Sequence, residues 1–445
     1  MSWTIEQVLA LAPDASSAKS GKDLSASRKW LTLGANDACV WGTIQGSGKD
    51  AYQTSIDLSL PAFKCTCPSR KFPCKHGLGL FLIFVQQRNA CAQQDVPPWT
   101  SEWLAKRAEK EETKVARAAT TAAAPDPDAE LKAAASAQKR TAARESKVSS
   151  GLRDLEVWLN DVIRSGFASL PGKPSSFWQT PAARLVDAQA PGLARRVRVL
   201  DGITTTGEDW PARLLRELTA LHLACEGWSR IDALPSGTQS DVRATLGFTV
   251  NQDEVLATDG VRDRWVIAGQ RVEEEDRVRV QRTWLFGTKS KRPALCLSFS
   301  AGPNQPFDVS LMPGTSVDAE LAFFPSAFPL RALVKQRHGV APPGYEEFPH
   351  VSISSANQFA AEALTANPWM ERVLFALSAV IPVRRAHGWI VRDDTGSFLP
   401  LAVAEAEAWK LLALSGGKPV ALSGEWNGES LRPLSVWSEG RFVAL

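Results

Sequence analysis

Hydrophobic and polar residues alternate in the N-terminal part of the chain. Tyr52, Thr54, Ile56 and Leu58 alternate with polar residues, and a second strand-like run precedes them at about 36–45. Alternation with a period of two is typical of a β-strand, and the turn-rich stretch GSGKD separates the two runs. We therefore predict a β-hairpin within residues 36–60.

The period of two disappears after residue 76. The stretch GLGLFLIFVQQRN lacks the turn-forming residues that usually bound a strand. It contains many large apolar residues: Leu78, Leu80, Phe81, Leu82, Phe84 and Val85. This pattern predicts a helix that is buried over much of its surface.

Large apolar residues almost vanish at 105–148, where Ala, Lys, Arg and Glu dominate around TTAAAPDPDAE. Such a segment has helical propensity but little surface to bury, so we interpret it as a linker, either helical or disordered. Apolar residues with helical spacing return at 149–240. They predict one buried face from Leu152, Leu155, Leu159, Val162 and Ile163, and another from Leu214, Leu215, Leu218, Leu221 and Cys225.

The pattern becomes strand-like again at 241–445, with runs such as RWVIAGQRV, DRVRVQRTWLF and SVDAELAFF and a helical interlude at 356–380. The prediction is an α+β multidomain fold. It consists of an N-terminal domain at 1–104, the linker at 105–148, an α-helical domain at 149–240 and a β-rich region at 241–445.

Composition adds constraints on location and partners. The 445 residues are 44% hydrophobic and 22% charged, with a net charge of +3, as in ordinary soluble proteins. The sequence has no apolar run long enough to cross a membrane and no basic leader, so we expect a cytoplasmic protein. A charge so close to neutral predicts no strong global attraction to nucleic acid or lipid. Seven cysteines, an odd number, do not suggest a disulfide framework.

Four candidate metal ligands lie within twelve residues, in CTCPSRKFPCKH. They form two doublets, Cys65 with Cys67 and Cys74 with His76. In an extended segment, residues two apart point the same way, so Cys65 and Cys67 can share a metal. Cys74 should then precede the predicted helix, with His76 in its first turn. Thiolates and imidazole are the preferred ligands of zinc.

This ligand pattern, between a hairpin and an apolar helix, resembles the SWIM zinc finger. The resemblance covers about residues 35–90, and the remainder looks like the long bacterial proteins that carry this finger at their N-terminus. It implies zinc bound by Cys65, Cys67, Cys74 and His76, and binding of DNA or other proteins. Because four protein ligands complete a tetrahedron, we expect one structural zinc and no catalysis at the metal.

The residues around the ligands are basic. Lys64, Arg70, Lys71 and Lys75 lie among them, and Phe72 stands in the same loop. These residues either compensate the charge of the metal site or form a partner-binding surface. For Phe72 we favour packing on the hairpin over an exposed recognition role. The net charge favours a protein partner over DNA.

Other chemical motifs are weaker. GSGKD lacks the first glycine and the hydroxyl residue of a phosphate-binding loop, so we interpret it as a hairpin turn. His222 and Cys225 stand three apart but fit an apolar helix face, and EEED at 273–276 fits a solvated turn. The leading hypothesis is a zinc-containing adaptor for protein or nucleic acid. The alternatives are a DNA-binding regulatory protein and an enzyme whose active site lies in the β-rich region.

Overall fold

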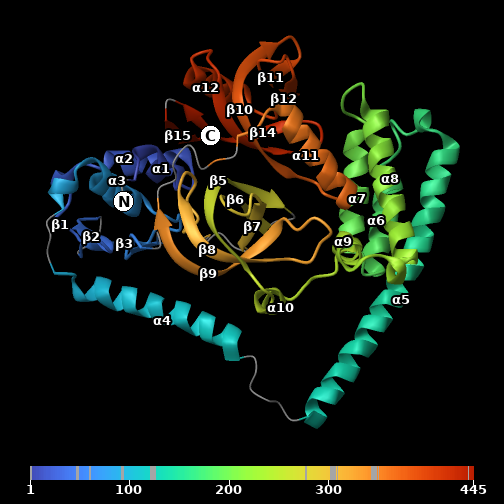
Figure 1. The fold of residues 1–445 in the computed structure, drawn as a ribbon, viewed down its shortest axis with the longest axis horizontal. Helices are drawn as coiled ribbons and strands as arrows, with labels where there is room; N and C mark the ends of the chain where they lie inside the picture. Colours follow the sequence, from blue (N-terminus) through green and yellow to red (C-terminus); the bar gives the residue numbers. More distant parts are fainter. Residues whose placement is uncertain are drawn as a thin grey trace.

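The computed structural model describes residues 3–46, 50–59, 62–91, 95–120, 127–275, 278–300, 307, 309–341, 348, 350–438 and 440–445. An N-terminal sheet with three helices, a helical bundle, a closed barrel and a six-stranded sheet follow one another along the chain (Figure 1). The predicted α+β multidomain fold is confirmed.

The N-terminal sheet has the order β1-β2-β3-β4, all antiparallel. Its strands are β1 (Thr32–Ala35), β2 (Cys39–Ile44), β3 (Tyr52–Asp57) and β4 (Ala62–Cys65). The predicted hairpin is β2–β3, in which Cys39 pairs with Asp57 and Ile44 with Tyr52. Three residues of the predicted GSGKD turn, 47–49, lie outside the described residues.

One face of this sheet packs on helix α3 (Lys75–Gln86), and helices α1 (Ile5–Ala10) and α2 (Ala15–Asp23) pack on α3. All residues from His76 to Phe84 are buried, as the apolar pattern predicts. A Cβ at Gly79 would lie 2.8 Å from Leu24 Cβ, and one at Gly21 would lie 2.8 Å from Leu78 Cβ. Glycine at these two positions therefore lets α2 and α3 approach closely.

The other face of the sheet is covered by α4 (Pro98–Thr120). Ser55 and Thr100 share a buried hydroxyl–hydroxyl hydrogen bond of 2.8 Å, and Arg107 pairs with the buried Asp57 at 3.2 Å. Ser55 and Asp57 are the polar positions of the alternating strand. Both faces of the sheet are therefore buried.

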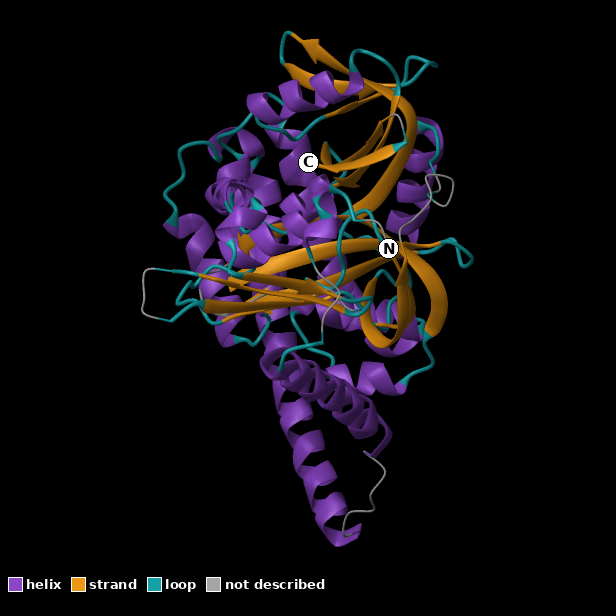
Figure 2. Ribbon diagram, turned by 90° about the vertical axis from the view of Figure 1, so that its left-hand side faces the viewer, coloured by secondary structure: helices purple, strands orange, loops and turns teal. Residues whose placement is uncertain are grey.

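The segment predicted as a linker is largely helical where it is described. It contains the C-terminal part of α4 and the N-terminal part of α5 (Pro127–Ser165), while residues 121–126 lie outside the described residues. Figures 1 and 2 show these two helical ends projecting from the body of the molecule. The predicted start of the helical domain, residue 149, falls inside α5.

The bundle consists of α5, α6 (Ser176–Asp187), α7 (Pro191–Ile203), α8 (Trp210–Ser229) and α9 (Ser236–Leu246) around one apolar core. Most of the predicted core residues are buried, but Ile163 and Leu215 are each 50% exposed. They lie at the edges of their apolar stripes, where helical spacing alone does not separate core from surface. His222 is also exposed, contrary to our prediction, and only Cys225 lies in the core.

The short helix α10 (Gln252–Ala257) precedes a closed barrel with the order β5-β6-β7-β9-β8. The strands are β5 (Val261–Glu275), β6 (Val278–Gly287), β7 (Pro293–Ser300), β8 (Ser316–Phe323) and β9 (Arg331–Ala341). Glu273 and Glu275 belong to β5 and pair with Arg282, so the predicted solvated turn is wrong for them. Asp276 lies outside the described residues.

The last sheet has the order β12-β11-β10-β13-β14-β15 and carries helices α11 (Ile353–Ala366) and α12 (Glu405–Ser415). Its strands are β10 (Val373–Arg385), β11 (Gly388–Arg392), β12 (Phe398–Pro400), β13 (Val420–Trp426), β14 (Leu431–Ser438) and β15 (Arg441–Ala444). The predicted helix at 356–380 ends early. Asn367 precedes Pro368, and a residue before proline disfavours the helical conformation, so 373–380 is strand.

Specific contacts join these units. Trp369, which follows α11, lies in the core of the bundle and donates from Nε1 to the carbonyl of Ala220 at 2.9 Å. Met312, which precedes β8, is fully buried in the core of the N-terminal unit. Gln7 of α1 donates from Nε2 to the carbonyl of Gly314 at 2.5 Å. None of the helices in the described part of the chain is long and apolar enough to span a membrane.

Candidate metal centre

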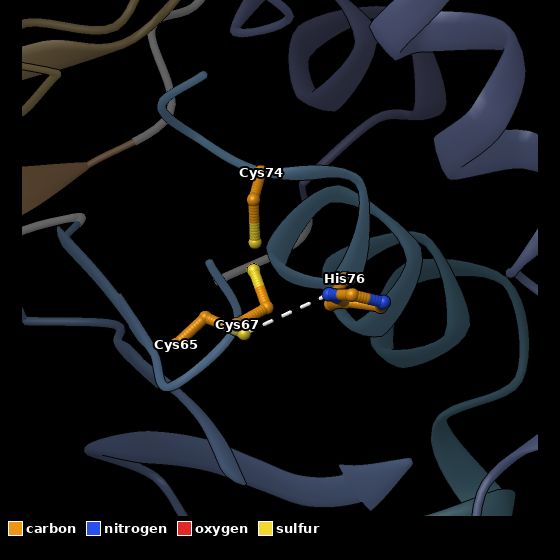
Figure 3. Close-up of side chains that lie close together, drawn as sticks. All are labelled: Cys65, Cys67, Cys74 and His76. Atoms are coloured by element: carbon orange, nitrogen blue, oxygen red, sulfur yellow. Dashed lines mark hydrogen bonds between the residues drawn. The ribbon is translucent and has the colours of Figure 1, made fainter. Parts of the chain in front are cut away.

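The four predicted ligands converge at the junction of β4 and α3 (Figure 3). Cys65 ends β4, and Cys67 follows it in an extended segment whose Thr66 still donates from its backbone N–H to Gln53 at 3.0 Å. Cys74 is the N-cap of α3, and His76 lies in its first turn. The two doublets therefore approach from a strand end and a helix start, as the spacing predicts.

The ligand atoms of the four residues all lie within 4.8 Å of one another. Cys65 Sγ is 3.8 Å from His76 Nδ1. A tetrahedral zinc with Zn–S bonds of about 2.3 Å sets its sulfur ligands about 3.8 Å apart, so the spacing of these ligand atoms is close to what zinc requires. Three cysteines and one histidine form a full ligand set for a structural Zn²⁺.

The four ligand groups are close enough to shift one another's pKa values. Hydrogen bonds from Cys65 and then Cys74 lower the pKa of Cys67, while the same interactions with Cys65 and Cys67 raise the pKa of Cys74. Burial opposes protonation of His76, but its hydrogen bonds with Cys65 and Cys67 outweigh this effect and raise its pKa to about 9. Sulfurs this close cannot all carry a negative charge unless a cation lies among them.

Neighbouring side chains orient the ligands. The hydroxyl of Thr54, fully buried on β3, lies 3.2 Å from Cys65 Sγ. The ring of Tyr52 packs against the His76 imidazole at a centroid distance of 5.2 Å. The backbone N–H of Gly77 donates to Cys74 Sγ at 3.5 Å. Such outer contacts fix ligand geometry and tune metal affinity.

The loop between the doublets, 68–73, is exposed except for Pro73, whose bond to Phe72 is cis. Phe72 is 37% exposed and meets Phe63 of β4 edge-on at 6.3 Å. The Phe72 ring therefore packs by its edge on β4, next to the predicted hairpin, and also keeps a partly exposed surface.

The four cations differ in their contacts. Lys64 extends over the α4 side of the sheet, where its Nζ lies 3.4 Å from the carbonyl of Trp99. Lys71 pairs with Asp14 at 2.8 Å, and this hydrogen bond, together with one from the backbone of Ser17, lowers the pKa of Asp14 to about 2. Arg70 and Lys75 are exposed and make no ion pair within the described residues. Two of the four predicted partner-binding cations, Lys64 and Lys71, therefore make contacts within the protein.

Other candidates do not form a second cluster among the described residues. His222 and Cys225 diverge, because one is exposed and the other buried. Cys91 is buried in the N-terminal core. Two pockets lie in the β-rich region. One, of about 720 Å³, has Lys418 as its charged residue, and the other, of about 350 Å³, has Arg271, Glu407 and Arg432.

Comparison with protein families gives two matches. Residues 52–83 match the SWIM zinc finger, and residues 143–246 match the SWIM-associated four-helix bundle domain. The first contains all four ligands, and the second covers the C-terminal half of α5 together with α6 to α9. Neither the comparison with curated proteins nor that with solved structures gave a match.

Proposed function

Since this chain contains a SWIM zinc finger and the helical bundle that is associated with it, we propose that it is a cytoplasmic adaptor without catalytic activity. SWIM fingers are interaction modules, and the four protein ligands leave zinc no open position for a water or a substrate. Zinc binding contributes folding free energy and holds the loop between the ligand doublets.

The observation that carries the proposal is which part of the finger remains accessible. The sheet is covered by α3 on one face and by α4 on the other, and α3 is buried along most of its length. A helix packed in this way cannot enter a DNA groove. The loop between the ligand doublets, with Arg70, Phe72 and Lys75 exposed in or beside it, is an accessible surface of the finger.

A protein partner fits this surface better than duplex DNA. Two of the four cations, Arg70 and Lys75, are exposed and outside ion pairs within the described residues. They allow about two phosphate contacts, which corresponds to a salt-dependence slope no steeper than about −1.8. Such binding is weak at physiological salt. A partly exposed aromatic flanked by cations suits an acidic protein surface with an apolar pocket, because charges steer association and a buried ring holds it.

Affinity capture with the intact protein tests the proposal. The loop variant Arg70→Ala with Phe72→Ala is compared with a matched control, Arg153→Ala with Phe299→Ala, in which an exposed arginine and an exposed phenylalanine are removed elsewhere. We expect a protein that is retained by the wild type and the control and lost by the loop variant.

Titration with mixed-sequence duplex DNA at about 150 mM salt provides the opposing test. Sub-micromolar binding that the loop variant abolishes would replace the adaptor with a DNA-binding regulatory protein. Retention of the same partner by the loop variant would show that the finger does not recognise it.

A further inference from the structure

The three strands β12, β11 and β10 form one edge of the six-stranded sheet, at the top of Figure 1 and away from the finger. In the register of these strands, Arg392 pairs with Phe398 on β12 and with Ile381 on β10. Arg385 pairs with Gly388, four residues before Arg392. Because side chains alternate between faces, Arg385, Arg392 and Phe398 share one face of the sheet.

This arginine–aromatic face, defined as Arg385, Arg392 and Phe398, is open to solvent. Both arginines are exposed, and the Phe398 ring is 50% exposed. The Arg385 guanidinium lies 5.0 Å from the centroid of that ring, which is cation–π distance. A phenyl ring has two faces, so stacking of the guanidinium on one leaves the opposite face for another planar group.

The charges around this face are mostly positive. Neither Arg385 nor Arg392 makes an ion pair within the described residues, and His387 is exposed in the neighbouring β10–β11 turn. Asp394 is exposed in the β11–β12 turn, whereas Asp393 is buried and accepts hydrogen bonds from Thr395 and Ser397. The face therefore presents two guanidinium groups, and one exposed carboxylate lies in a neighbouring turn.

The opposite face of the same strands carries another arginine–aromatic pair, and a carboxylate already contacts both of its members. Arg384 lies 5.6 Å from the ring of Trp409 on α12, and Trp409 is 46% exposed. Glu405 pairs with Arg384 at 3.2 Å and accepts from Trp409 Nε1 at 3.0 Å. The Glu405 carboxylate neutralises this pair, so the two faces differ mainly in whether the cation is available.

We propose that the arginine–aromatic face binds single-stranded nucleic acid. Every base has a π-face that stacks on an exposed aromatic ring, and the adjacent guanidinium groups pair with phosphates of the same strand. A duplex hides its base faces within the stack, so it would contact only the arginines. An acidic peptide without apolar side chains, such as polyglutamate, would likewise use the cations without the ring.

Fluorescence anisotropy of the intact, zinc-loaded protein with a labelled single strand of about 20 nucleotides tests this proposal. We expect Phe398→Ala to weaken binding at least about fivefold, since loss of one stacked base costs about that much or more. Arg385→Ala with Arg392→Ala should also weaken binding and reduce the salt-dependence slope by about 1.4, the value for two phosphates of a single strand.

Two matched controls keep the test specific. Arg384→Ala with Trp409→Ala removes the neutralised pair on the opposite face and should leave affinity within about twofold. The finger variant Arg70→Ala with Phe72→Ala should also leave single-strand binding unchanged, which separates this surface from the proposed adaptor role of the finger.

Several results would overturn the inference. These are no binding of the single strand up to about 100 µM protein, equal affinity for the corresponding duplex, or full affinity in Phe398→Ala. Polyglutamate that binds the same face as tightly as the single strand would identify an acidic protein segment as the occupant instead.

Discussion

Thr54 links the N-terminal sheet to the metal centre through a single hydroxyl. It is fully buried on β3, pairs in register with Cys65 on β4, and lies 3.2 Å from the sulfur of that ligand. A donor to a thiolate disperses part of its charge and fixes its direction. One polar side chain thus couples strand register to zinc geometry.

Replacing Thr54 by valine tests this coupling. The variant keeps the branched shape but removes the hydroxyl, so we expect zinc affinity to fall about tenfold in competition with a chelator. Thr54→Ser, which retains a hydroxyl, should bind zinc nearly as well as the wild type. Equal affinity in the valine variant would show that the hydroxyl is irrelevant to the metal.

His350 leads to a prediction about acid stability. Burial lowers its pKa from 6.5 to about 4. The unfolded chain therefore binds this proton more readily than the folded protein, and stability that is full above pH 6.5 decreases as the pH falls towards 4. His350→Gln should show a smaller drop in melting temperature between pH 7 and about pH 5. An identical drop in both proteins would exclude His350 as the cause.

At the scale of elements, local patterns were sufficient for the hairpin, the ligand doublets and the helix after them. These features depend on neighbours in sequence, and the structure places Cys74 and His76 at the helix start as the spacing predicts. The covering of the second sheet face could not be foreseen. Ser55 and Asp57 have the pattern of solvent-facing residues, but Thr100 and Arg107, about fifty residues later, bury and satisfy them.

The close approach of α2 and α3 predicts the effect of an added methyl group. Gly79→Ala would set Cβ 2.8 Å from Leu24 Cβ, so we expect a loss of about 1–3 kcal/mol in stability despite better helix propensity. Gly202→Ala in α7 has no atom within 4 Å and should be neutral or slightly stabilising. The measurement is the melting temperature of both variants with zinc present. Similar changes in melting temperature for the two variants would contradict the packing argument.

Limited proteolysis tests which parts of α4 and α5 are held in place. Arg107 pairs with Asp57, and Arg144 donates to the carbonyl of Gly247 at 3.0 Å. The segment between them has few large apolar residues and many basic ones, so trypsin should cut first between Lys110 and Arg140. First cleavage inside 176–246 would contradict this order.

At the scale of the whole molecule, the N-terminal unit is docked on the barrel. Met312 is buried in the finger core, and Gln7 hydrogen-bonds Gly314. The interpretation of 105–148 as a linker did not predict this docking. Contacts between residues about 300 positions apart do not affect the local pattern of hydrophobic residues. This docking could therefore be identified only from the structure.

Zinc removal should therefore increase hydrogen exchange outside the finger as well as within it. In hydrogen exchange of the Cys67→Ser variant, we expect faster exchange in peptides covering 309–315 as well as in α3, because the finger core that buries Met312 loosens. Peptides from α6 to α9 act as the internal control and should be unchanged. Unaltered exchange at 309–315 would mean that the docking survives without the metal.

The burial of the finger sheet on both sides also determines which segment of the chain can be transferred to another protein as a folded finger. A fragment that ends near residue 90 keeps every zinc ligand but leaves Ser55 and Asp57 without Thr100 and Arg107. The smallest portable unit therefore extends at least to Arg107, well past the four residues that bind the metal. A fusion or transplant designed around the ligand motif alone would carry the zinc site without the helix that protects its sheet.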